Sequence, residues 1–86
     1  AKYHSQIRAC YETGLRAIPG LTGQVSVNFE INPLGALNFS KVTRSSLANP
    51  GVENCITQRM MGWKFPRPVG GVNVKVNYPF QLRPVS

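Results

Sequence analysis

The 86-residue sequence predicts an α+β fold with the element order α-β-β-α-β, in which two helices pack on one face of a three-stranded antiparallel sheet. Two observations carry this prediction. Apolar residues recur with helical spacing in residues 1–18 and 49–64, and they alternate with polar residues in three other segments. Each expected helix therefore has one apolar stripe and each strand one apolar face, which two layers bury together. If the third strand lies beside the first, the sheet order is 2-1-3.

The first helix is expected within residues 1–18, and Pro19-Gly20 terminates it because proline cannot continue a helix. Gly14 lowers the helix propensity but leaves the spacing intact. The apolar stripe consists of Tyr3, Ile7, Cys10, Tyr11, Leu15 and Ile18.

The next two strands are expected to form a hairpin. In the first strand, Val25, Val27, Phe29 and Ile31 alternate with polar residues. The segment Asn32-Pro33-Leu34-Gly35 predicts the tight turn, since proline and glycine favour the backbone angles that a turn requires.

The return strand is expected over residues 36–44, with Leu37 and Phe39 on one face. Val42 is out of phase with these two residues. This mismatch predicts a β-bulge near Ser40-Lys41.

The pair Asn49-Pro50 predicts the start of the second helix, because asparagine caps helix N-termini and proline suits the first helical position. The helix is expected to end by Lys64, since Phe65 precedes a proline and is disfavoured in the α region. Its apolar positions are Val52, Cys55, Ile56, Met60 and Trp63, and we expect Trp63 to pack in the core.

Residues 72–80 give the clearest strand pattern, with Val72, Val74, Val76, Tyr78 and Phe80 alternating with Asn73, Lys75, Asn77 and Pro79. Pro79 lacks an amide hydrogen, so this strand is expected at an edge of the sheet. Residues 81–86 are expected outside regular structure. An open edge formed by Val72, Asn73, Val74, Lys75, Val76, Asn77 and Tyr78 is a candidate surface to which another extended chain could add as a strand.

The inventory of charged residues excludes many kinds of chemistry. The chain has ten Lys and Arg, three Asp and Glu, one His and a formal net charge of +7. The three carboxylates are all glutamates, so neither a Ser-His-Asp triad nor an aspartate pair can be built. His4 has no acidic neighbour in sequence and is expected to be solvated. We therefore predict a protein that is not an enzyme, with no catalytic residues, no cofactor and no small-molecule substrate.

Cys10 and Cys55 lie far apart in the sequence, with no second cysteine pair. A zinc site would need ligands beyond His4, so no metal site is predicted. The remaining alternatives are a disulfide and two buried thiols, of which we favour the disulfide. A disulfide would place the domain in an oxidising compartment.

The basic charge keeps a second function class open, namely a nucleic-acid-binding α+β module. Against it, the cations occur singly and no RNP-like or GXXG-like motif appears. The strand aromatics Phe29, Phe39, Tyr78 and Phe80 are assigned to the core, not to a base-stacking surface. Other readings of the charge are a solvated surface or a contact with acidic proteins, peptidoglycan or anionic lipid.

Several motifs resemble the TonB C-terminal family over nearly the whole chain. They are the segment 23–35 followed by Val42 and Ser45-Ser46, the sequence Trp63-Lys64-Phe65-Pro66, and the closing residues 72–80. Within that family, Ile7-Arg8-Ala9-Cys10-Tyr11-Glu12 and Val52-Glu53-Asn54-Cys55-Ile56 resemble the paired-cysteine AgmX/PglI C-terminal branch, which is associated with bacterial gliding-motility machinery.

This resemblance implies one TonB-like C-terminal domain, residues 1–86, taken from a longer protein anchored in the inner membrane. It implies a periplasmic location, where the paired cysteines fit a disulfide. It also implies strand addition of an envelope protein to the edge 72–78 and coupling of that partner to an inner-membrane energy- or force-transducing complex. Peptidoglycan is a further possible contact, and nucleic acid ranks second as a partner.

Overall fold

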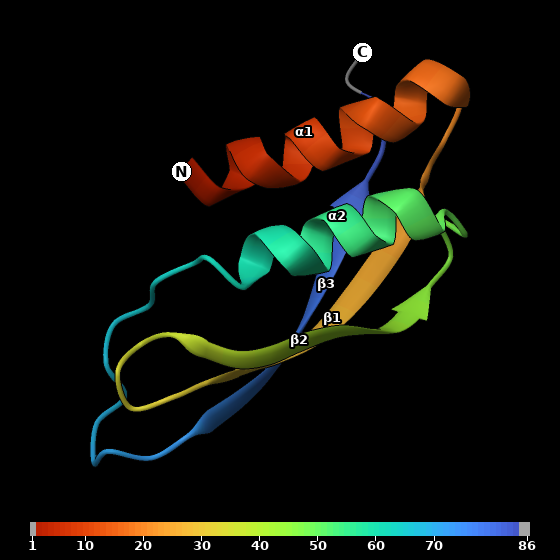
Figure 1. Cartoon of the computed structure of the whole chain (residues 1–86). Helices are drawn as coiled ribbons and strands as arrows, with labels where there is room; N and C mark the ends of the chain where they lie inside the picture. Colours follow the sequence, from red (N-terminus) through yellow and green to blue (C-terminus); the bar gives the residue numbers. More distant parts are fainter. Residues whose placement is uncertain (1, 85–86) are drawn as a thin grey trace.

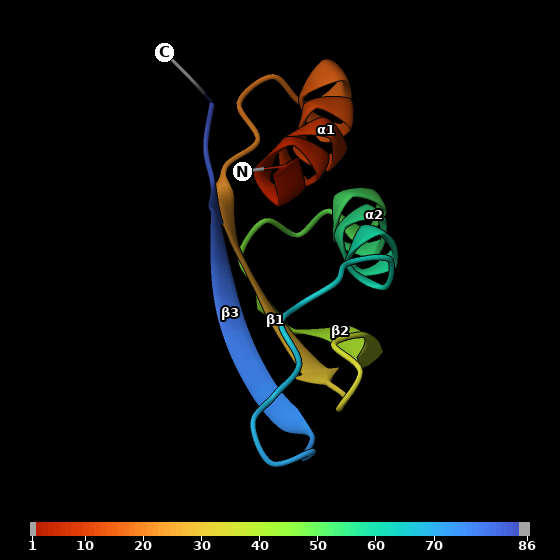
Figure 2. The ribbon, with the colours of Figure 1, turned by 90° about the vertical axis from the view of Figure 1, so that its left-hand side faces the viewer.

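The computed structural model, which describes residues 2–84, contains five elements in the predicted order (Figure 1). They are α1 (Lys2–Ala17), β1 (Gly23–Ile31), β2 (Leu37–Ser45), α2 (Pro50–Met60) and β3 (Val74–Leu82). The sheet order is β2-β1-β3, and β1 is antiparallel to both neighbours. Both helices lie on the same side of the sheet (Figure 2). The predicted fold class, element order and strand order are therefore confirmed.

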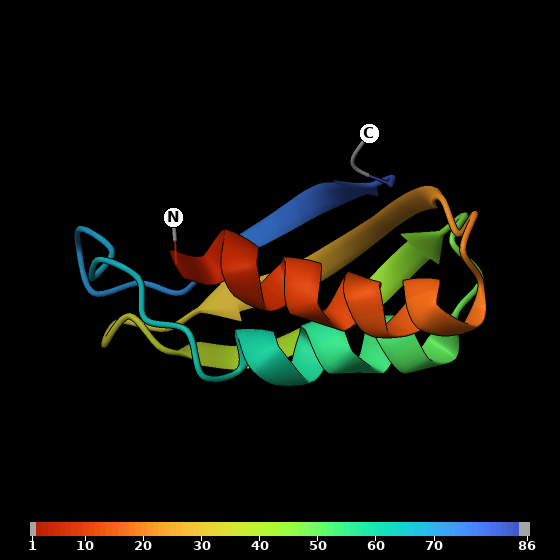
Figure 3. The ribbon, with the colours of Figure 1, turned by 90° about the horizontal axis from the view of Figure 1, so that it is seen from above.

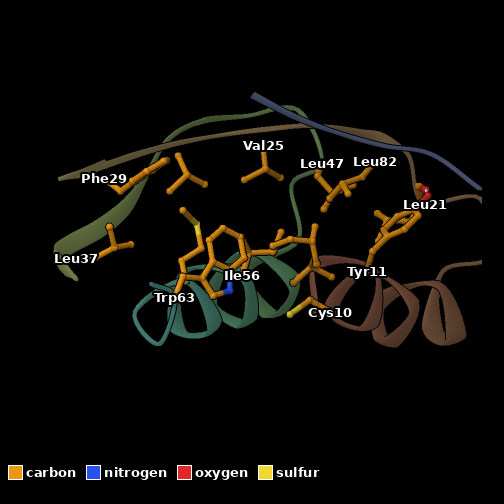
Figure 4. Packing of buried hydrophobic residues seen from close by; sticks show 14 residues of the cluster. Cys10, Tyr11, Leu21, Val25, Phe29, Leu37, Leu47, Ile56, Trp63 and Leu82 are labelled. Carbon is orange, nitrogen blue, oxygen red and sulfur yellow. The ribbon is translucent and has the colours of Figure 1, made fainter. Parts of the chain in front are cut away.

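The core lies between the helices and the sheet. Val25 and Phe29 of β1 point toward the helices, on the side where Ile56 of α2 lies (Figure 4). Val27 of β1 and Met60 of α2 belong to the same buried cluster. Trp63 follows α2 and is buried as predicted, with its ring stacked on Tyr3 at a centroid distance of 4.5 Å. The remaining members of the core are Ile7, Cys10, Tyr11, Leu21, Leu37, Leu47, Val52 and Leu82.

The start of α2 follows the sequence signal. The Asn49 side chain accepts a hydrogen bond from the Val52 amide, and Pro50 is the first helical residue. Glu53 in the first turn accepts hydrogen bonds from the Asn49 amide and the Ser45 hydroxyl. A carboxylate there also interacts favourably with the positive end of the helix dipole.

Gly35 lies where the hairpin turn packs closely against the segment that follows α2. It has a φ of +86°, and a Cβ at this position would overlap the Phe65 carbonyl oxygen. The Phe65 amide donates to the Gly35 carbonyl oxygen at 2.8 Å. The turn and the chain beyond α2 are therefore held side by side.

Two details of β2 differ from the prediction. The register shifts lie at Asn38 and Thr43, not near Ser40-Lys41. The first shift reverses the alternation after Leu37, so Leu37 faces the helices while Phe39 pairs with Glu30 on the opposite face of the sheet. The assignment of Phe39 to the core beside Leu37 is wrong for this reason.

The boundaries of β3 also differ from the prediction. The strand begins at Val74, so Val72 and Asn73 precede it, and it continues through Gln81 to a buried Leu82. Tyr78 faces the helix side but is 47% exposed, because β3 lies beyond the cover of the helices. Seen from above the helices, β3 is on the far side of α1 from α2 (Figure 3).

Candidate interaction surface at the edge of β3

The predicted edge residues fall into two groups. Val72 and Asn73 belong to the loop before the strand, whereas Val74, Lys75, Val76, Asn77 and Tyr78 lie within β3. β3 pairs with β1 from Val74 to Leu82 without a register shift, and among residues 2–84 no other strand pairs with it. The other side of β3 is thus a long, regular edge.

The direction of the backbone groups on this edge follows from the pairing of β1. The Gln24 carbonyl oxygen accepts from the Ser46 amide, and the Asn32 amide donates to the Ala36 carbonyl oxygen, both on the β2 side. In antiparallel strands the N–H and C=O of one residue point to the same neighbour, and successive residues alternate. Even-numbered residues of β1 therefore point toward β2, and odd-numbered residues point toward β3.

The same alternation determines the direction of the backbone groups of β3. Val76, Tyr78 and Phe80 pair with the odd-numbered residues of β1, so their backbone groups point toward β1. The N–H and C=O groups of Lys75 and Asn77 consequently point away from the sheet.

Pro79 belongs to the outward-pointing set and has no amide to offer. This is the placement that sheets tolerate for proline, because no ladder bond to β1 is lost. The edge thus presents both donor and acceptor at Lys75, Asn77 and Gln81, but an acceptor alone at Pro79. An added strand would find complete pairing sites at Lys75 and Asn77 and an interrupted one beyond them.

The face of the sheet opposite the helices is polar and crossed by side-chain hydrogen bonds. Gln81 donates to Gln24 at 2.9 Å, and the Thr43 hydroxyl lies 3.3 Å from Asn77 Oδ1 across β1. The Asn28 side-chain oxygen is buried there and accepts no hydrogen bond within residues 2–84. These bonds link β1 and β2 to β3, the strand that carries the free edge.

The same face carries more positive than negative charge. Its cations are Lys41, Arg44 and Lys75, all exposed, and its carboxylate is Glu30, which pairs with Lys75 in the sheet register. Lys41 lies over the ring of Phe39, 5.6 Å from its centroid. The cations of this face thus lie on both outer strands, Lys75 on β3 and Lys41 and Arg44 on β2.

On the helix side, a groove runs between α1 and the second half of β3. Its volume is about 840 Å³, and apolar residues of both elements line it, among them Tyr11, Tyr78 and Phe80. His4, Arg8 and Glu12 follow one another at four-residue spacing along its α1 wall. The sequence did not predict this groove. The apolar stripe of α1 is the sequence feature behind it, and that stripe is equally consistent with a buried core.

Cys10 and Cys55 form a disulfide that joins α1 to α2, with their Cα atoms 5.6 Å apart. The bridge lies away from the β3 edge. Within residues 2–84, no three His, Cys, Asp or Glu side chains are close enough to hold a metal ion. In this part of the chain, no helix has the length and apolar character needed to cross a membrane.

Compared with family models, curated proteins and solved structures, the chain matches none of them. The assignment to the TonB C-terminal family therefore stays a prediction that rests on the motifs of the sequence.

Proposed function

We propose that the chain is a non-enzymatic periplasmic interaction domain, which binds an envelope protein by strand addition to β3. In this proposal it couples that partner to an inner-membrane energy- or force-transducing complex, such as gliding-motility machinery. The single observation that carries the binding mode is the regular free edge of β3, with outward backbone groups at Lys75 and Asn77. Main-chain hydrogen bonds give affinity in strand addition, and pockets for alternate side chains give specificity.

The groove beside α1 supports the same mode. A strand added to β3 places every second side chain on the helix side of the sheet. The side chains that reach the second half of β3, beyond the complete pairing sites at Lys75 and Asn77, would lie against Tyr78 and Phe80 and under the α1 wall. The partner's backbone would pair with the edge while its apolar side chains filled the groove.

The compartment and the coupling role rest on separate support. A structural disulfide persists in oxidising compartments and is rare in a reducing cytosol, which favours the envelope. The coupling role rests on the resemblance to TonB C-terminal domains alone.

The proposal is tested by photocrosslinking in the cells that produce the protein. A photoreactive amino acid at Asn77, on the free edge, is expected to give an adduct with one envelope protein. The matched position is Asn54, which is exposed on α2. Equal adducts from both positions, or none from Asn77, would contradict strand addition at this edge.

The cationic face of the sheet favours one second candidate, binding of nucleic acid through Lys41, Arg44 and Lys75. The two candidates differ in their response to salt. Nucleic-acid affinity falls as salt rises, and three phosphate contacts correspond to a loss of roughly 40-fold between 50 and 200 mM salt. A strand-addition complex is expected to change far less, so a salt titration of any complex separates them.

A further inference from the structure

Exposed aliphatic residues gather at one end of this elongated molecule, whose extents are 45 × 23 × 19 Å. Two loops lie at this end, the hairpin turn 32–36 and the segment 66–73, and we call them together the two-loop tip (Figures 1 and 3). Val69 is 96% exposed, Leu34 70% and Val72 54%. Single exposed apolar residues are ordinary, but three of the seven large exposed ones within residues 2–84 occupy these two short loops.

The two loops are fixed relative to each other. The Phe65 amide donates to the Gly35 carbonyl oxygen, and Val74 pairs with Ile31, so both ends of the second loop are tied to the hairpin. Gly70 and Gly71 have positive φ values, which shape the turn after Val69. The exposed side chains thus project from an anchored tip.

The charge around the tip is positive. Arg67 lies in the second loop, and Lys64 and Lys75 flank it; all three are exposed. Neither loop contains a carboxylate. The nearest in sequence is Glu30, which pairs with Lys75 in register and accepts a hydrogen bond from Asn38.

We infer that the two-loop tip docks on a lipid bilayer that contains anionic headgroups. Apolar side chains that project from a basic surface insert at the boundary of headgroups and acyl chains, while the cations contact lipid phosphates. The exposed apolar residues of the tip are aliphatic, whereas protein–protein hot spots are enriched in tryptophan, tyrosine and arginine in packed pockets. This inference is independent of the proposed strand addition, because it uses neither the β3 edge nor the α1 groove.

The test is co-sedimentation of the chain with vesicles of equal parts phosphatidylcholine and phosphatidylglycerol, compared with phosphatidylcholine alone. A net charge of +7 draws the whole surface toward anionic vesicles, so variants at the two ends of the molecule decide the result. Val69→Ser and Leu34→Ser are each expected to weaken binding roughly three- to tenfold. Arg67→Gln is expected to weaken it about fivefold at low salt.

The matched controls are Ile18→Ser and Arg16→Gln at the other end of the molecule. Ile18 is 49% exposed, close to the exposure of Val72, and Arg16 is exposed in the last turn of α1. Both controls are expected to bind as the native chain does. Equal losses from variants at the two ends would show that the binding is unspecific charge attraction and would contradict the inference. Absence of binding to the mixed vesicles would overturn it outright. Loss from Arg67→Gln without loss from either serine variant would overturn insertion as well.

Discussion

The two outer strands of the sheet have nine residues each, yet their edges differ. β2 contains two bulges, at Asn38 and Thr43, and two of its serine side chains are hydrogen-bonded to α2. The Ser40 hydroxyl donates to the Thr57 carbonyl oxygen, and the Ser45 hydroxyl donates to Glu53. β3 has no bulge, and a single proline interrupts its donors.

Bulges, covering helices and prolines are the devices by which proteins prevent unwanted pairing at sheet edges. β2 has bulges and side-chain bonds to α2, whereas β3 has only a proline, which leaves the backbone groups of Lys75 and Asn77 available. The comparison teaches that the edge of β2 is interrupted by bulges, whereas the edge of β3 is regular along half its length. Strand addition is therefore expected at β3 and not at β2.

The largest expected effects come from substitutions in the core, which should destabilise the whole fold and affect the β2 and β3 edges alike. Trp63 is buried against Tyr3, and its indole N–H donates to the Gln6 side-chain oxygen at 2.7 Å. Trp63→Ala is expected to lower the free energy of unfolding by about 3–5 kcal/mol, through lost burial and the cavity left behind. Chemical denaturation checks this, and a loss below 1 kcal/mol would contradict the role of Trp63 in the core.

Removal of the disulfide should act in the same way. Replacing both Cys10 and Cys55 by serine is expected to lower the free energy of unfolding by about 4 kcal/mol, since a cross-link over 45 residues restricts the unfolded chain. Denaturation of this variant and of the native protein in reducing buffer should give the same loss. An unchanged native midpoint after reduction would show that the bridge contributes little.

A smaller change sharpens the comparison at β3 itself. Pro79→Thr restores an outward amide and completes the donor row beside Asn77. One additional backbone hydrogen bond is worth about 1 kcal/mol net, so self-association or partner affinity is expected to rise about fivefold. Sedimentation velocity measures the self-association, with Val42→Thr on β2 as the control. Equal behaviour of the two variants would show that Pro79 does not guard the edge.

Local sequence signals predicted most of the fold because they act over a few residues. Asn49-Pro50 fixed the start of α2 through a cap that spans three residues, and the alternation of Val25, Val27 and Phe29 identified the buried face of β1. Phe39 was misplaced because a bulge at Asn38 inverts the alternation, and nothing in the local sequence marks that residue.

The candidate surface was harder to predict for a similar reason. Val72 continues the apolar alternation of β3, but β1 ends at Ile31, which pairs with Val74, so no partner remains for it. The groove beside α1 depends on how far β3 lies from the helix. That distance is set by tertiary packing, and the sequence pattern does not encode it.

The central claim is that β3, and not β2, accepts a partner strand. The most direct test places a proline on each edge at a residue whose amide points outward, Lys75→Pro on β3 and Val42→Pro on β2. The yield of the photocrosslinked adduct at Asn77 is then measured in cells, after thermal melts confirm that both variants fold. Lys75→Pro is expected to reduce the yield about tenfold or more, because it removes a backbone donor and adds the bulk of a ring, whereas Val42→Pro should leave it unchanged. An equal yield from the two folded variants would contradict strand addition at β3.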